Sequence, residues 1–335
     1  MPDLTAGRVI ANRYEIVALI GRGGAASVWR AYDPALQREV AVKELMMAPH
    51  LALEERRRSM REARTAARVQ HPGAIPIYDI VTDAEQVLIV MEYVRAPTLT
   101  DRIAKVGALP PEFVAALGIQ LVDTLEAAHN NGIVHRDIKP ANVMITDDGR
   151  TCLGDFGVAM LVDRTGRAKA GVAGGTPGYM SPEQAEQKDI SSASDIFSLG
   201  ATLFFAAEAR GPFDRQDWRD AVKAVSTEPP AVPRRAGPLA PVFHRMFLKA
   251  PDQRPSHDTV RRELFQILAK RMPQLLDESA PTFDKGPVPP RLPLPGNTRE
   301  RNKPDANKPD ALPNSPVPPP RLPLRPKTQE QGGDK

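Results

Sequence analysis

The sequence predicts an α+β fold with two lobes, a small β-rich lobe followed by a larger α-helical lobe, and then a disordered tail rich in proline. Three observations predict this arrangement. Alternating apolar and polar residues fill much of the first third of the chain, apolar residues at three- and four-residue spacing follow, and 15 of the 35 prolines lie in residues 281–335. We therefore divide the chain into an N-terminal extension (1–13), a β-rich lobe (14–94), a helical lobe (95–271) and a tail (272–335).

Turn residues separate the alternating runs of the first lobe, as expected for successive strands of one sheet. The predicted strands are 14–20, 26–32, 39–45, 74–81 and 87–93. One helix interrupts them over about 51–69, because that segment is rich in Glu, Arg and Ala, which are good helix formers.

The longest predicted helix begins at Pro110 and Pro111 and ends at Asn131 and Gly132, since proline favours the first turn and glycine the end of a helix. Its apolar residues recur at three- and four-residue spacing, which predicts a buried amphipathic helix. Further helices are predicted over about 194–209, 217–227, 240–247 and 257–270.

The tail has too few apolar residues to form a core, so we expect a disordered, partly polyproline II segment. Residues 302–306 recur at 307–311, and the motif at 287–294 returns at 316–324 with one proline inserted. Residues 316–321 fit the Pro-x-x-Pro-x-Arg pattern that SH3-like domains bind. A plain spacer explains the same composition, so both interpretations stay open.

Charge, apolar stretches and cysteine content indicate which partners and which cellular location to expect. Residues 1–280 contain 35 basic and 35 acidic side chains, so we expect no nucleic-acid partner. The apolar, uncharged stretch 196–207 is far shorter than the roughly 20 residues that cross a bilayer, so we expect no membrane insertion. Cys152 is the only cysteine, which favours the cytoplasm and a buried apolar role for that side chain.

A glycine-rich segment lies between the first two predicted strands. Its residues are Gly21, Arg22, Gly23, Gly24, Ala25, Ala26, Ser27 and Val28. Small residues there would let backbone N–H groups approach the phosphates of a nucleotide. It is not a P-loop, because no Gly-Lys-Ser/Thr follows, and a strand rather than a helix comes next, which excludes a dinucleotide fingerprint. By itself the segment is equally explained as a hairpin turn.

Lys43 ends a β-alternating run about twenty residues after these glycines. Its ordinary interpretation is an edge lysine with its ammonium in water. Glu62, on the predicted helix 51–69, could instead pair with Lys43 and hold the ammonium against the phosphates of ATP. For Glu62 alone, a solvated helix face explains the residue as well.

Residues 135–142, His-Arg-Asp-Ile-Lys-Pro-Ala-Asn, carry the most specific pattern in the chain, and Asp155-Phe156-Gly157 follows at loop distance. A carboxylate at Asp137 can orient a substrate hydroxyl and accept its proton, while Lys139 can neutralise charge on a transferring phosphoryl group. On these motifs the chain resembles the Hanks-type (eukaryotic-like) serine/threonine protein kinase family, bacterial branch. The resemblance covers about residues 14–271.

This resemblance implies a bilobal protein-kinase fold and transfer of the γ-phosphate of ATP to Ser or Thr hydroxyls of protein substrates, with autophosphorylation and a signalling role. It implies that Asp137, Lys139, Lys43 and Glu62 are catalytic, and that Asn142 and Asp155 hold Mg²⁺, or Mn²⁺ in its place. It places ATP contacts on the glycine-rich segment and on Ile20, Ala41, Lys43, Met91, Glu92 and Val94.

The same resemblance implies two structural contacts. Asp195 matches the buried aspartate that braces the catalytic loop. Arg254 matches the arginine that pairs with the glutamate of the Ala-Pro-Glu motif, which is Glu183 in the Ser-Pro-Glu of this chain. The replacements at Ser181 and at Ala26, the third glycine position, are small and remove no catalytic group.

Regulation is also implied at the loop between Asp155 and Glu183. Arg136 implies a pocket for a phosphate on this loop. Thr165 is the acceptor in its variable part, so we hypothesise that Thr165 is autophosphorylated, whereas Thr176 belongs to the segment near the substrate.

Two other functions compete with an active protein kinase. A scaffold of the same fold would bind nucleotide or partners without turnover, but every catalytic residue is present. A small-molecule phosphotransferase is disfavoured by the Ser-Pro-Glu segment, which resembles a platform for protein substrates. The sequence does not indicate an oligomeric state, and His71, His129, His244 and His257 show no metal-ligand spacing, which favours ordinary packing roles.

Overall fold

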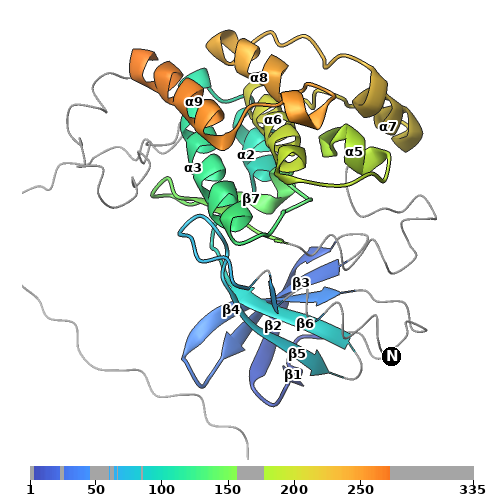
Figure 1. The fold of residues 1–335 in the computed structure, drawn as a ribbon. Coiled ribbons are helices and arrows are strands. Elements are labelled where there is room, and N and C mark those ends of the chain that lie inside the picture. Colours follow the sequence, from blue (N-terminus) through green and yellow to red (C-terminus); the bar gives the residue numbers. More distant parts are fainter. Residues whose placement is uncertain are drawn as a thin grey trace, which may run out of the picture. The chain divides into compact units, whose positions relative to one another are not determined.

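The computed structural model describes residues 4–22, 26–45, 60, 64–65, 67–83, 86–156 and 177–271 (Figure 1). Residues 23–25 of the glycine-rich segment, residues 157–176 and the proline-rich tail lie outside the described residues. The described part confirms the predicted two-lobe α+β class, with a sheet in the first lobe and mostly helices in the second.

Six antiparallel strands form the sheet, in the order β1-β2-β3-β4-β6-β5. They are β1 (Val9–Ile10), β2 (Tyr14–Arg22), β3 (Ala26–Asp33), β4 (Arg38–Leu45), β5 (Ile77–Asp83) and β6 (Gln86–Glu92). Successive side chains of a strand face opposite sides, so Val40 and Val42 of β4 enter the core of the first lobe with Leu88 and Val90. Lys43 consequently faces the other side of the sheet, toward Asp155.

Two features of the sheet differ from the sequence-based expectation. β5 begins at Ile77 instead of residue 74, directly after Pro76, which has no N–H to donate to a strand ladder; Ala74 instead forms an isolated bridge with Leu153. In addition, β1 extends the sheet before Tyr14, and Leu4 and Ile10 are buried in the core of this lobe.

The helices of the second lobe pack around one apolar core. They are α2 (Leu99–Val106), α3 (Pro111–Asn130), α5 (Pro182–Ala185), α6 (Ser192–Glu208), α7 (Trp218–Thr227), α8 (Ala240–Met246) and α9 (His257–Arg271). Their bounds agree within two residues with those predicted for α3, α6, α7, α8 and α9. A Cβ on Gly118 of α3 would approach Leu264 of α9 to 2.6 Å and Leu203 of α6 to 2.9 Å, so glycine allows these three helices to pack closely (Figure 1).

Two helices were not predicted, although the sequence carries a local signal for each. Thr98 caps α2 and forms a capping box with Asp101, and Ser181 caps α5 and forms one with Gln184. Such a Ser/Thr-x-x-Asp/Gln spacing predicts a helix start. Of the predicted helix 51–69 only residues 60, 64–65 and 67–69 are described, and the chain has left the helix by Ala67.

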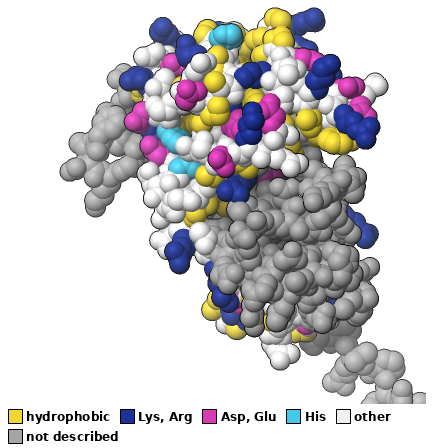
Figure 2. Space-filling view, turned by 45° about the vertical axis from the view of Figure 1, so that its right-hand side comes forward, with side chains coloured by type: hydrophobic (Ala, Val, Ile, Leu, Met, Phe, Trp, Pro, Cys, Tyr) yellow, Lys and Arg dark blue, Asp and Glu magenta, His cyan; other side chains and the backbone are white. Residues whose placement is uncertain are grey.

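A short two-stranded sheet lies between α3 and the loop that carries Asp155. Its strands are β7 (Val143–Ile145) and β8 (Thr151–Leu153). Among the described residues, no helix is long and apolar enough to span a membrane. Basic and acidic side chains intermingle on the face of the helical lobe that Figure 2 shows, consistent with the even charge balance of residues 1–280.

Candidate active site

The loop 135–142 is anchored to α6 through Asp195, which is fully buried. Its Oδ2 accepts a hydrogen bond from the backbone N–H of His135 at 2.7 Å, and its Oδ1 accepts one from the N–H of Arg136 at 2.8 Å. Arg136 has a φ of 69°, a left-handed conformation that costs a non-glycine residue about 1–3 kcal/mol. The two bonds to Asp195 hold the backbone in this conformation.

His135 connects this loop to the segment that precedes Asp155. Its Nδ1 accepts from the N–H of Asp137 at 3.2 Å and its Nε2 lies 2.8 Å from the carbonyl oxygen of Gly154. A carbonyl can only accept, so the proton of the neutral ring is on Nε2. The ring also packs against Phe156, with centroids 4.5 Å apart. His135 thereby sets the spacing between the Asp137 loop and the Asp155 loop.

Asp137 lies at the centre of a compact polar group. Lys139 Nζ donates to both of its carboxylate oxygens, at 2.9 and 2.8 Å. Asn142 Nδ2 donates to its backbone oxygen at 2.7 Å and to Oδ2 at 3.0 Å. The structure therefore brings together Asp137, Lys139 and Asn142, three of the five polar residues of the 135–142 motif, and the amide oxygen of Asn142 is a further ligand oxygen.

Lys43 of β4 reaches from the sheet to the loop after β8, where its Nζ lies 2.7 Å from Asp155 Oδ1. Burial would raise the pKa of Asp155, but the charge and hydrogen bond of Lys43 outweigh it, so that the pKa lies below its usual value. Asp155 is therefore ionised at neutral pH. The described partner of Lys43 is this carboxylate, while Glu62, its sequence-predicted partner, lies outside the described residues.

Several residues predicted to contact the nucleotide are neighbours on adjacent strands of the sheet. Gly21 of β2 pairs with Val28 of β3, Val28 pairs with Lys43, and Ala41 pairs with Met91 of β6. Residues directly opposite each other in an antiparallel sheet project to the same face. Ile20, Arg22, Ala26 and Ser27 lie in the same β2–β3 hairpin, whereas Gly23, Gly24 and Ala25 lie outside the described residues.

The segment after β6 packs on the strand that precedes Asp155. Val94 forms a small apolar cluster with Ile75 and Cys152, and Met91 and Met144 pack against it. Cys152 is buried on β8, as predicted, and burial raises the pKa of its thiol to about 11. The thiol is therefore an apolar element of this cluster at neutral pH.

A cavity of about 630 Å³ lies beside Glu92 and Val94. It is lined by Tyr32, Gln37, Glu39, Glu92, Tyr93, Val94, Arg95, Thr146 and Arg150. The lining contains neither Lys43 nor Asp137, and its charged residues pair with one another, Arg95 with Glu39 and Arg150 with Glu92. This cavity is separate from the polar site.

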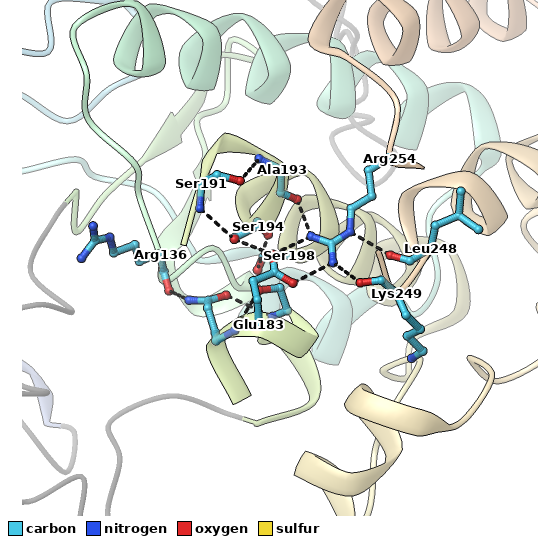
Figure 3. A network of polar contacts seen from close by, with 11 residues as sticks. Arg136, Glu183, Ser191, Ala193, Ser194, Ser198, Leu248, Lys249 and Arg254 are labelled. Carbon is cyan, nitrogen blue, oxygen red and sulfur yellow. Dashed lines mark hydrogen bonds and ion pairs between the residues drawn. The ribbon is translucent and has the colours of Figure 1, made fainter. Parts of the chain in front are cut away.

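Glu183 and Arg254 form the predicted ion pair, shown in Figure 3. Arg254 Nη1 and Nη2 each donate to one oxygen of Glu183 at 2.7 Å. The remaining guanidinium hydrogens are directed at the backbone oxygens of Ala193, Leu248 and Lys249. All five donors that a guanidinium possesses therefore have an acceptor.

The same network reaches the catalytic loop through α5. Ser194 Oγ donates to Glu183 Oε1 at 2.5 Å, and Gln184 Nε2 donates to the backbone oxygen of Arg136 at 2.7 Å. Burial would raise the pKa of Glu183, but the hydrogen bonds from Arg254 and Ser194 hold it below its usual value. α5 is thereby held between α6 and the 135–142 loop.

Sequence reasoning missed several contacts around this site. Gln184 is one, since nothing local distinguishes it from other polar helix residues. His129 is another, because its Nε2 lies 2.7 Å from Asp195 Oδ2. Among the described residues, no three His, Cys, Asp or Glu side chains are grouped so that they could hold a metal ion. Thr165 and Thr176 lie outside the described residues.

This geometry belongs to one known class of domain. The protein kinase domain family matches residues 14–266, about three quarters of the chain, and the chain belongs to this family. Among solved structures, the kinase domain of PknI from Mycobacterium tuberculosis superposes with a TM-score of 0.64 at 27% identity, covering 79% of this chain and 99% of that one.

Two similar proteins are serine/threonine-protein kinases of bacteria. The DNA damage-responsive serine/threonine-protein kinase RqkA of Deinococcus radiodurans is 36% identical over 80% of this chain. The serine/threonine-protein kinase PrkC of Bacillus subtilis is 37% identical over 75% of it. The chain spans about two fifths of the length of these relatives, 38% and 39% respectively.

Proposed function

We propose that this chain is an ATP-dependent serine/threonine protein kinase, which transfers the γ-phosphate of ATP to Ser or Thr hydroxyls of proteins and of its own chain. The observation that carries the proposal is the cluster of Asp137, Lys139 and Asn142 together with the Lys43–Asp155 pair, on two loops that His135 joins. Phosphoryl transfer needs positioning and charge neutralisation more than covalent chemistry, and these five side chains supply both.

Each residue of the site has a role that follows from its chemistry. The Asp137 carboxylate orients the substrate hydroxyl and accepts its proton. Lys139, within hydrogen-bond distance of that carboxylate, neutralises charge that develops on the transferring group. Lys43 offers its ammonium to the phosphates, and Glu62 is proposed to steady it. The β2–β3 hairpin, Ala41 and residues 91–94 enclose the nucleotide.

A divalent metal fits the oxygen ligands of this site. Asn142 and Asp155 offer an amide oxygen and an ionised carboxylate, the hard ligands that Mg²⁺ prefers. When bound, Mg²⁺ or Mn²⁺ would neutralise phosphate charge. The low pKa of Asp155 keeps the carboxylate available as a ligand at neutral pH.

The direct test is incubation of the purified full chain with γ-labelled ATP and Mg²⁺ or Mn²⁺, with Asp137→Asn as control and phosphopeptide mapping. Label on Ser or Thr in the wild type alone supports the proposal. Nucleotide binding without label on the chain or on myelin basic protein contradicts it and favours a scaffold. Label on a small molecule but on no protein favours the phosphotransferase alternative.

Several narrower statements belong to the same proposal. Arg136 and Thr165 form a regulatory pair once Thr165 is phosphorylated, and mapping that finds the active chain unmodified at Thr165 contradicts this.

The tail serves either as a spacer or as a ligand for a polyproline-binding domain. If either holds, deletion of 281–335 leaves peptide phosphorylation intact. The single cysteine supports a cytoplasmic location as part of the same proposal.

A further inference from the structure

A chain of hydrogen bonds runs from α9 to the catalytic loop. His257, the first residue of α9, has its Nε2 2.7 Å from Nδ1 of His129 near the end of α3. His129 Nε2 lies 2.7 Å from Asp195 Oδ2, the oxygen that also accepts from the N–H of His135. The catalytic loop is thus linked to α9 through two imidazoles and one carboxylate.

For a neutral His129, the chemistry of these groups assigns the protons. Asp195 accepts two backbone hydrogen bonds and has no proton to give when ionised, so Nε2 of His129 must be the donor toward it. With Nε2 protonated, Nδ1 of a neutral His129 can only accept. The proton between the two imidazoles is then on Nε2 of His257, which donates to His129. Every member of the chain is paired in this arrangement.

His129 depends on His257 for its orientation. The His129 side chain is only 8% exposed, so an Nδ1 without a partner would carry the cost of a buried, unpaired polar atom. The ring would then turn or admit water, and its Nε2–H would leave Asp195. In metal sites the second nitrogen of a ligating histidine is fixed by an outer hydrogen bond in the same way. Here the oriented histidine contacts no metal but the carboxylate of Asp195, which holds the catalytic loop.

We infer that His257 is a positioning residue for phosphoryl transfer: it holds His129 with Nε2–H toward Asp195 and thereby steadies the backbone of His135 and Arg136. This inference rests on the proposed kinase function. The three residues are far apart in the sequence: Asp195 follows His129 by 66 residues, and His257 follows it by 128. It makes the N-terminal end of α9 part of the support of the active site.

Two substitutions separate the hydrogen bond from the volume of the side chain. A glutamine side chain could place an amide N–H where the Nε2–H of His257 lies, so His257→Gln should keep the donor, whereas His257→Leu removes it. The matched control is His244→Leu, which changes an exposed histidine on α8. Full-chain proteins are compared by kcat and KM for ATP, by melting temperature, and by ¹⁵N-histidine NMR, where six histidines give few signals.

The expected result is a fall in kcat of about five- to tenfold in His257→Leu, as for the loss of one hydrogen bond, with KM for ATP within about twofold. The Nε2–H of His129 should exchange slowly with water in the wild type and in His257→Gln, and at least about tenfold faster in His257→Leu. His257→Gln and His244→Leu should retain kcat within about twofold.

Three results would overturn the inference. These are an unchanged exchange rate of the His129 Nε2–H in His257→Leu, a wild-type His129 that carries a proton on Nδ1 (with or without one on Nε2), or a kcat equally low in both His257 variants. The NMR measurement does not need turnover. If the wild-type chain transfers no phosphate, the proposed function fails, while the state of His129 still decides whether His257 positions it.

Discussion

Arg254 binds both carboxylate oxygens of Glu183 at 2.7 Å, and neither side chain is more than 5% exposed. The pair joins the helix α5 to the segment before α9. Since Gln184, the next residue, donates to the backbone of Arg136, the ion pair also supports the catalytic loop.

Removing one member of this pair should destabilise the fold strongly. Arg254→Met leaves the Glu183 carboxylate without its guanidinium partner and removes one donor from each of three backbone oxygens, and the loss of one partner of a buried pair costs about 3–5 kcal/mol. Urea unfolding should show this loss for Arg254→Met. The double variant Arg254→Met/Glu183→Gln should lose less than the sum of the single variants, and strict additivity would mean that the two residues do not interact.

Asp137→Asn should abolish most turnover without unfolding the chain. The amide cannot accept the proton of the substrate hydroxyl, and general-base catalysis contributes about 10²- to 10⁴-fold. Initial rates with γ-labelled ATP should fall by that factor while KM for ATP changes little. Asp147→Asn, at an exposed turn position, should keep the wild-type rate. An active Asp137→Asn enzyme would disprove the assignment of the base.

Lys43→Met should abolish turnover and also change the titration of Asp155. Burial raises the pKa of this carboxyl, and Lys43 is the main group that lowers it. Because the folded pKa lies below the unfolded one, Asp155 contributes stability that is present at neutral pH and is lost as pH falls through the folded value. Without Lys43 the pKa should rise, so acid unfolding should begin at a higher pH. Lys105→Met on α2 should leave both properties unchanged.

The stability of the chain should fall as pH decreases below about 6.5, the ordinary histidine value. Burial and the neighbouring His129 lower the pKa of His257, with Arg261 acting in the same direction and Glu126 and Asp195 opposing it. Between the folded and unfolded pKa values the unfolded chain binds more protons, so stability rises with pH. Burial lowers the pKa of His71 as well.

Chemical denaturation at a series of pH values measures this dependence. His257→Gln should have a shallower slope below pH 6.5 than the wild type, with the remaining slope due to His71. An equal slope in both proteins would show that His257 does not titrate differently on folding.

Cys152 should be inert to thiol reagents in the folded chain. Burial raises its pKa from 9.0 to about 11, so roughly one thiol in a thousand is ionised at pH 8. Iodoacetamide at pH 8 should modify the native protein at least about 100-fold more slowly than the protein in urea. Comparable rates in both states would mean that β8 opens readily to solvent.

Much of the active site could be predicted because its residues are close together in the chain. Asp137, Lys139 and Asn142 lie within one short motif, and their mutual hydrogen bonds need only the local turn. The strands and long helices were predicted for a similar reason, since their apolar residues repeat with the period of the element that buries them. α2 and α5 were missed although their capping residues are visible in the sequence.

Other features depend on how distant segments pack. The contact of His129 with His257 requires the end of α3 to meet the start of α9, and these residues are 128 positions apart. That alignment depends on the close approach of the two helices at Gly118. Both histidines, taken from the sequence alone, were interpreted as ordinary packing residues.

By itself the sequence determined the two-lobe α+β class, the catalytic motifs and the family resemblance, because periodicity and short motifs are local properties. Only the tertiary structure decided that Lys43 pairs with Asp155, that Gln184 binds the backbone of Arg136, and that α9 contacts the support of the catalytic loop. These contacts join distant residues, and a hydrogen bond forms only when packing brings its two atoms to about 3 Å with suitable angles.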